Sequence, residues 1–204
     1  MKISCIQGSK RGHLLIHINE EPWKEIHSSV WGNRPALPQD CSSLQSFVEH
    51  FYELEYPAAK QFTLRKLAVR SYFVQELQSA LQKVFISEPT SIKILAEMTR
   101  LGFLDDQAHS ERWIRSQAAK KWGPYAIVQK LRAKGVVIED FSQILAEEYG
   151  AEERKKQIRA LLNKKLAARG ESLYPERQKA ISSLMRKGFD LQEIQDVLKT
   201  EFYD

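Results

Sequence analysis

Three copies of one apolar pattern, each ending at a glycine, constrain the fold of this 204-residue chain more than any other feature. Apolar side chains stand eight, seven and four residues before each glycine and one residue after it. The glycines are Gly102, Gly135 and Gly188, and the apolar sets are Ile94, Leu95, Met98 and Phe103; Ile127, Val128, Leu131 and Val136; and Ala180, Ile181, Leu184 and Phe189. The offsets before the glycine put three side chains on one face of a helix. Glycine suits the left-handed residue that ends a helix, so the pattern predicts repeated helix–glycine–helix units in a mainly α-helical protein.

The flanking residues extend these units into expected helices. Asp105 or Asp106 is a good N-cap for the helix after Gly102. Gly123 ends that helix, and Pro124 begins the next one, at a position where its missing N–H is not needed. We expect helices over about 64–83, 90–101, 106–121, 124–134, 138–148, 152–168, 175–187 and 190–201. They form three helical repeats, 56–105, 106–149 and 150–204. The glycine spacings of 33 and 53 residues differ, so the repeat is not a strict solenoid period. Chance similarity between amphipathic helices is the alternative explanation of the repeat.

The first 55 residues follow a different pattern. Apolar and polar residues alternate over 3–7 and 14–18 around a turn bounded by Gly8 and Gly12, which is typical of a β-hairpin. Trp23, Ile26 and the residues up to 31 extend this unit, and 32–40 is expected to be a loop. A short helix over 44–54, capped by Ser42 or Ser43, follows. Residues 1–55 are therefore predicted to be an N-terminal extension that contains a β-hairpin and a short helix.

Composition and motifs argue against several classes of protein. The two cysteines, Cys5 and Cys41, cannot form a disulfide framework or a four-cysteine zinc site. The sequence has no apolar run of about 20 residues and no secretory signal, so we expect a cytoplasmic protein without a membrane partner. It also lacks a phosphate-binding loop and a nucleophile elbow. His13 and His17 share a strand face without a third ligand nearby. We therefore expect neither an enzyme nor a bound cofactor or metal.

Positive charge is concentrated in the helical part. Residues 1–60 carry a net charge of −1, and residues 61–204 carry +6. Two basic stretches, 107–136 and 151–170, supply the candidate partner-binding residues. These are Arg112, Arg115, Lys120, Lys121, Lys130, Arg132, Lys134, Arg154, Lys155, Arg159, Lys164 and Lys165. Such stripes fit contact with nucleic acid or an acidic protein surface, although a solvated helix face is the alternative. Trp113 and Trp122 lie among these residues, where they either stack on a partner or pack in the core.

The central part of the chain resembles the signature of the RecX family. The resemblance rests on Leu-Gly-Phe-Leu-Asp-Asp at 101–106, Arg-Trp-Ile-Arg-Ser at 112–116, Trp-Gly-Pro at 122–124 and the segment 127–136. Residues 67–71 with 76–77 resemble the first repeat of the family, and 184–189 with Ile194 resemble the third. The family often has Tyr or Phe where Trp122 stands. The match covers roughly residues 60–204.

The resemblance implies a fold and a function. RecX proteins are three tandem three-helix repeats in an elongated, curved array, without a catalytic site or cofactor. They bind the RecA recombinase filament along its groove and inhibit its ATPase, strand-exchange and coprotease activities, so they modulate DNA repair, recombination and the SOS response. Some also bind single- or double-stranded DNA. We expect this chain to do the same as a monomer. The alternative is a stand-alone DNA-binding protein of the helix-turn-helix type, suggested by the basic stripes and the short helix–glycine–helix corners.

Overall fold

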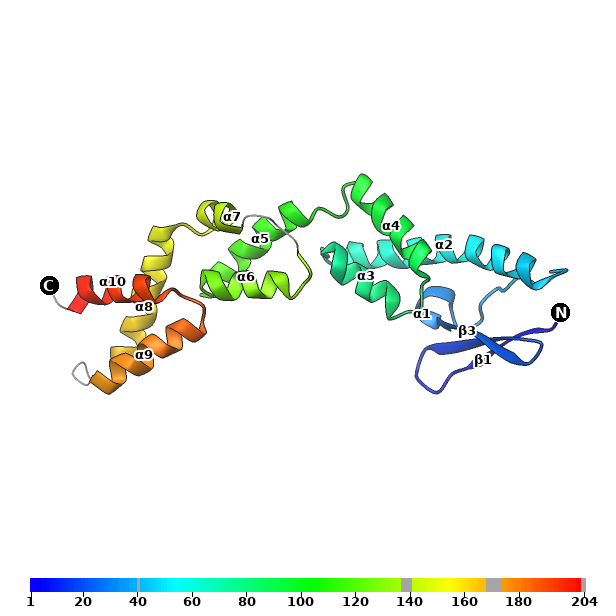
Figure 1. Cartoon of the computed structure of the whole chain (residues 1–204), viewed down its shortest axis with the longest axis horizontal. Helices are drawn as coiled ribbons and strands as arrows, with labels where there is room; N and C mark the ends of the chain where they lie inside the picture. Colours follow the sequence, from blue (N-terminus) through cyan, green and yellow to red (C-terminus); the bar gives the residue numbers. More distant parts are fainter. Residues whose placement is uncertain (40, 137–140, 168–173, 203–204) are drawn as a thin grey trace. The chain divides into compact units, whose positions relative to one another are not determined.

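The computed structural model describes residues 1–39, 41–136, 141–167 and 174–202 (Figure 1). The chain divides into two compact units, Met1–Asp105 and Asp106–Asp204. The first unit combines a small β-sheet with helices, and the described part of the second consists of helices and their connections. The prediction of a mainly helical chain after an N-terminal β-containing segment is confirmed.

The N-terminal sheet has three antiparallel strands in the order β1-β2-β3. They are β1 (Ile3–Gln7), β2 (His13–Ile18) and β3 (Glu21–His27). The first two strands are the predicted hairpin, with Ile3 opposite Ile18 and Gln7 opposite Leu14. Asn19 and Glu20 both have positive φ and form the tight turn into β3. Leu14, Ile16 and Ile18 alternate toward the buried face, as period-two patterning requires.

Helix α2 (Leu44–Val69) joins this sheet to the first helical corner. Separate helices over 44–54 and 64–83 were predicted, and this part of the prediction is wrong in two places. α2 runs without interruption through Pro57 and ends at Val69, and α3 (Val74–Gln82) is a separate helix. Proline inside a helix costs about 3 kcal/mol. Burial of apolar residues on both sides of it, Phe47 and Phe51 before and Ala59 and Phe62 after, offsets that cost.

The first unit has two cores, which α2 connects. One lies between the sheet and the first turns of α2 and contains Ile16, Ile26, Phe47 and Phe51. The other packs the second half of α2 against α3 and α4 (Glu88–Arg100) and contains the buried Met98. The short helix α1 (Ser28–Trp31) contributes Val30 to this second core. The expected boundary at residue 55 therefore falls inside one helix.

All three repeat glycines end a helix in the left-handed region, as predicted, with φ of 75°, 74° and 87° at Gly102, Gly135 and Gly188. At each corner the residue after the glycine donates its N–H to the carbonyl five residues earlier, on Met98, Leu131 or Leu184. These three acceptor residues are fully buried. The apolar residue after the glycine is buried at two of the corners, as Val136 and Phe189. At the third corner Phe103 is 55% exposed, and Leu104 fills the core there instead.

The second unit contains α5 (Asp106–Ala119), α6 (Pro124–Arg132), α7 (Phe141–Glu148), α8 (Ala151–Ala167), α9 (Tyr174–Arg186) and α10 (Leu191–Phe202). These agree with the predicted helices to within a few residues. Ile138, which was expected to begin the helix over 138–148, lies outside the described residues. None of the helices in the described ranges is both long and apolar enough to cross a bilayer.

Candidate partner-binding surface

Two glycines bring the corner before α6 into backbone contact with the corner after α9. The Gly123 N–H donates to the Lys187 carbonyl at 2.8 Å, and the Tyr125 N–H donates to the Gly188 carbonyl at 3.1 Å. A Cβ on Gly123 would lie 2.2 Å from the Gly188 carbonyl carbon, and a Cβ on Gly188 would lie 2.3 Å from the Ala126 nitrogen. Only glycine permits this approach, so these two corners form one joint.

At the joint, two lysines face the ring of Trp122, and a third, Lys120, is close enough to Lys130 to affect its charge. Lys130 Nζ lies 3.1 Å from the centroid of the Trp122 ring, and Lys187 Nζ lies 5.7 Å from it. These distances fit cation–π contact, which favours an ammonium group over an indole face. Burial, together with the positive charges of Lys120 and Lys187, lowers the pKa of Lys130. Such mutual repulsion between like charges is relieved when an anion binds.

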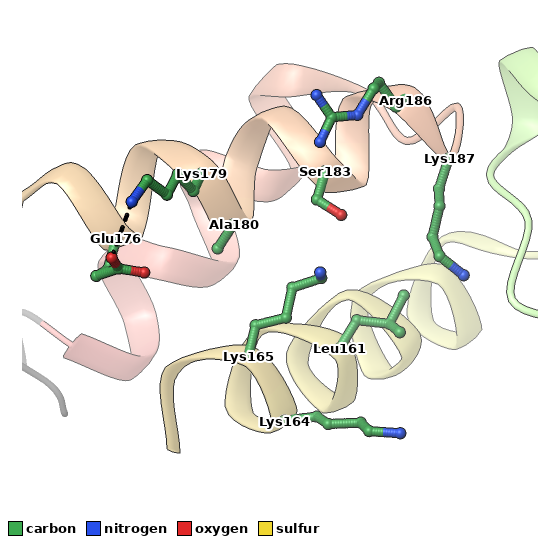
Figure 2. Close-up of a pocket in the computed structure, with 9 residues that line it drawn as sticks. All are labelled: Leu161, Lys164, Lys165, Glu176, Lys179, Ala180, Ser183, Arg186 and Lys187. Atoms are coloured by element: carbon green, nitrogen blue, oxygen red, sulfur yellow. Dashed lines mark hydrogen bonds and ion pairs between the residues drawn. The ribbon is translucent and has the colours of Figure 1, made fainter. Parts of the chain in front are cut away.

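A basic groove begins beside the joint and runs between helices α8 and α9 (Figure 2). Its volume is about 630 Å³. Five basic residues line it, together with Glu176 and three small or apolar residues. The basic residues are Lys164 and Lys165 on α8 and Lys179, Arg186 and Lys187 on α9 and its end. Glu176 forms an ion pair with Lys179 at 3.1 Å, so the lining carries a clear excess of positive charge.

Lys187 belongs to both features, because it lines the groove and also faces the Trp122 ring. The Trp122 cluster and the α8–α9 groove therefore form one surface, which we call the joint surface. It consists of Lys120, Trp122, Lys130, Lys164, Lys165, Lys179, Arg186 and Lys187. Clustered cations with low-dielectric walls concentrate positive potential and attract an anionic partner.

The structure places only four of the twelve predicted residues on this surface: Lys120, Lys130, Lys164 and Lys165. Two of the others, Arg115 and Arg154, form ion pairs with residues of the same unit. Arg115 Nε forms an ion pair with Glu148 Oε2 at 2.7 Å. Arg154 is largely buried, donates to the Tyr149 carbonyl at 2.7 Å and forms an ion pair with Glu193 at 2.7 Å. These two arginines hold helices of the second unit together.

The remaining predicted residues lie elsewhere on the second unit. Lys155 pairs with Glu152 one turn earlier on α8, at 3.2 Å. Arg132 lies 5.8 Å from the Phe141 ring. Arg112, Lys121 and Arg159 are exposed, and Lys134 is half-buried. Nothing in the structure joins this group to the groove, so these six residues stay sequence-based candidates.

Sequence reasoning missed Lys179, Arg186 and Lys187. All three lie on or just after α9, outside the two stretches in which basic residues are dense. Their signal was their spacing, since residues at 179, 183, 186 and 187 fall on one face of a helix. For Trp122, the sequence left open whether the side chain stacks on a partner or packs in the core. It is half-buried rather than enclosed in the core.

Comparison with known proteins identifies the family. Models of the second and third three-helix domains of RecX match residues 105–140 and 150–198. The regulatory protein RecX of Pelodictyon phaeoclathratiforme is 33% identical over 145 residues, which cover 70% of this chain and 88% of that protein. The RecX of Mycolicibacterium smegmatis is 31% identical, with 70% and 79% covered. The chain belongs to the RecX family.

Other relatives agree with this assignment. The RecX of Oceanobacillus iheyensis is 32% identical, and the matched region spans about half (52%) of its length. A crystal structure of a regulatory protein RecX superposes with a TM-score of 0.67 at 19% identity, covering 96% of this chain and 98% of the other. RecX from Lactobacillus salivarius gives a TM-score of 0.66 over 72% of this chain, also at 19% identity. At that identity these two structures support the fold alone.

The joint surface extends across both matched RecX domains. Trp122 and Lys130 lie in the second domain, and the α8–α9 groove lies in the third. The Trp-Gly-Pro segment that carried the family resemblance therefore has a structural explanation. Its glycine makes the joint, its proline begins α6 with φ already suited to a helix, and its tryptophan supports the lysines.

Proposed function

We propose that this RecX protein is a negative regulator of the RecA recombinase and uses the joint surface to bind the RecA–DNA filament. Binding inhibits the ATPase, strand-exchange and coprotease activities of RecA, and in this way modulates DNA repair and recombination. The observation that carries the proposal is the continuous basic surface across the second and third RecX domains, centred on Lys187. A filament that exposes acidic side chains and DNA phosphates presents a complementary charge.

The geometry of the joint supports simultaneous contact by both domains. Two backbone hydrogen bonds and the glycine contacts hold Trp122 and Lys187 together. Because little ordering is then needed on binding, less conformational entropy is lost. In this proposal the protein acts by occupying the filament, as a monomer in the cytoplasm. The described residues contain no group of three or more His, Cys, Asp or Glu able to hold a metal, and no step of the proposal requires one.

The test is RecA-catalysed ATP hydrolysis on single-stranded DNA with increasing amounts of this protein. The wild-type chain should inhibit at or below equal molar ratio to RecA. The variant K130E/K187E should inhibit at least about tenfold less, because each reversal replaces attraction by repulsion at a partly desolvated site. The variant K10E/R11E is the matched control, since it changes the net charge equally on the exposed hairpin turn of the first unit. Equal inhibition by both variants would overturn the assignment to the joint surface.

A stand-alone DNA-binding function is the second candidate, and the Trp122–lysine cluster is the observation that favours it. Aromatic side chains with adjacent cations are typical of single-strand binding, and a helix-turn-helix protein would also select a duplex sequence. Electrophoretic mobility shifts without RecA separate the two candidates. Tight, sequence-selective duplex binding combined with no effect on RecA would favour the second candidate. Weak binding that ignores sequence and falls steeply with salt would favour the first.

A further inference from the structure

The two edges of the N-terminal sheet differ in how they are protected. β3 carries Pro22, which has no N–H, together with Glu21, Lys24 and Glu25. Proline and charged side chains are the usual means by which proteins prevent an edge strand from pairing. β1, with the sequence Ile-Ser-Cys-Ile-Gln, has neither a charge nor a proline. The β1 edge is therefore open to pairing with a further strand.

The hydrogen bonds at the two ends of β1 determine which backbone groups point outward. The Asn19 N–H donates to the Lys2 carbonyl, and the Gly8 N–H donates to the His13 carbonyl. In an antiparallel pair, residues that bond to the partner strand alternate with residues that do not. Lys2 and Gly8 bond to β2, so Ser4 and Ile6 do as well. The N–H and C=O groups of Ile3, Cys5 and Gln7 consequently face away from the sheet.

A groove of about 390 Å³ runs along this edge. All five residues of β1 line it, although successive side chains of a strand point to opposite faces. A cavity that contacts all five must follow the backbone edge rather than one face of the sheet. The opposite wall comes from residues 33–39, where Arg34 is exposed and Leu37 is buried. Arg34 is the one charged residue among the described residues that line the groove.

We propose that this groove binds an extended peptide segment of a partner protein, which adds to the sheet as a strand beside β1. The outward groups of Ile3, Cys5 and Gln7 pair with the peptide backbone, as in other cases of strand addition. No acidic residue stands among the described residues that line the groove, so the positive charge of Arg34 is not balanced there. Arg34 therefore favours a peptide that carries an acidic side chain. This site lies in the first unit and is independent of the joint surface.

The size of the edge favours a peptide over a second copy of the chain. Five residues at about 3.4 Å each give a strand roughly 17 Å long. A stable dimer buries about 800 Å² on each partner, and one short strand pair supplies only part of that area. A peptide bound between β1 and residues 33–39 would instead contact both walls of the groove.

The experiment is selection of random octapeptides displayed on phage against the full-length protein, followed by fluorescence anisotropy with the synthetic peptides. The selected peptides should share one acidic residue beside a segment that alternates apolar and polar residues. On binding, the backbone amides of Ile3, Cys5 and Gln7 should exchange hydrogen more slowly. The amides of Ser4 and Ile6 should change little, because they already bond to β2.

Three variants make the test specific. C5P removes an outward N–H that the sheet does not use, which edge strands tolerate, and should weaken peptide binding roughly tenfold or more. C5S keeps that N–H and should bind within about twofold of wild type. R34E should weaken peptides that carry an acidic residue and spare their glutamine counterparts. Circular dichroism confirms that each variant is folded.

Several results would overturn the proposal. One is the absence of any selected peptide with a dissociation constant below about 1 mM, and another is equal binding by wild type and C5P. Concentration-dependent dimerisation that C5P abolishes, measured by sedimentation, would assign the edge to a second copy instead. RecA inhibition should be the same in C5P and wild type, so failure here is distinguishable from failure of the proposed function.

Discussion

The two units of the chain hold their elements together by different means. In the first unit, the fully buried Glu55 on α2 accepts hydrogen bonds from the Ser87 hydroxyl and N–H just before α4, and lies 3.6 Å from Lys24 on β3. One carboxylate thus connects sheet, long helix and corner. In the second unit, the joint at Gly123 and Gly188 is made by backbone atoms. Because backbone atoms make the joint, the lysine side chains beside it are available to form a surface. In the first unit, the charges of Glu55 and Lys24 are paired with each other inside the protein.

The two units also differ in what their lysine side chains contact. Residues 1–105 carry 12 basic and 11 acidic side chains, and residues 106–204 carry 19 and 15. Lys24 is paired with Glu55, and Lys60 is paired with Glu97 at 2.8 Å. In the second unit, Lys130 and Lys187 face an indole ring instead of a carboxylate. The difference indicates that a basic surface for a partner depends on where lysines lack acidic neighbours more than on how many there are.

Gly188→Ala should give the largest effect, because it breaks the joint. The new Cβ would lie 2.3 Å from the Ala126 nitrogen, at a residue with φ of +87°. Backbone cannot yield as a flexible side chain can, so we expect a loss of about 3 kcal/mol or more in urea unfolding, together with weaker RecA inhibition. Gly102→Ala is the matched control. It has the same left-handed φ but no atom within 4 Å, and it should cost only about 1–2 kcal/mol. Equal losses would argue against the joint.

Glu55→Gln should destabilise the first unit by about 2–3 kcal/mol, because it leaves Lys24 without a carboxylate partner near a buried site. Denaturant unfolding followed by circular dichroism measures the loss. Glu49→Gln, on the exposed part of the same helix, is the control and should change stability by less than about 0.5 kcal/mol. RecA inhibition by folded E55Q should be normal. Reduced inhibition at full folding would mean that the two units do not work separately.

The smallest effect concerns acid stability. Hydrogen bonds from Lys60 and from the Tyr56 hydroxyl lower the pKa of Glu97. A lowered carboxyl pKa contributes stability that is present above the ordinary glutamate pKa and is lost as the pH falls through the lowered value. Wild type should therefore lose more stability than Glu97→Gln on going from pH 6 to pH 3, a range chosen to bracket the ordinary pKa of about 4.3. Thermal melting at several pH values in this range measures the loss of stability. An equal loss in wild type and Glu97→Gln would contradict the lowered pKa of Glu97.

Much of the fold followed from local patterns. The glycine corners, the hairpin and most helix ends were predictable because a left-handed residue, a period of two and a period of 3.6 leave direct traces in sequence. The corners at Phe85 and Lys121 were not. Both residues have positive φ, and at each the next N–H bonds to the carbonyl five residues back, on Leu81 or Gln117. These two corners have the same geometry as the glycine corners but contain no glycine at the left-handed position. The sequence therefore has no local feature that predicts them.

The candidate surface was only partly predictable for a related reason. Counting charges found Lys120, Lys130, Lys164 and Lys165, but it also selected Arg115 and Arg154. Acidic partners distant in sequence, Glu148 and Glu193, bind these two arginines. Lys187 was missed because its importance comes from its distance to Trp122, which is 65 residues earlier in the chain. Charge density in sequence does not report pairing across helices.

The amino-acid sequence by itself determined the helical repeats, the β-containing N-terminus and the resemblance to RecX, since each depends on residues close together in the chain. Only the tertiary structure decided that Gly123 and Gly188 meet, which cations remain at the surface and which edge of the sheet stays open. Those features depend on contacts between distant segments, where a few tenths of an ångström at a backbone atom decide whether two elements can pack.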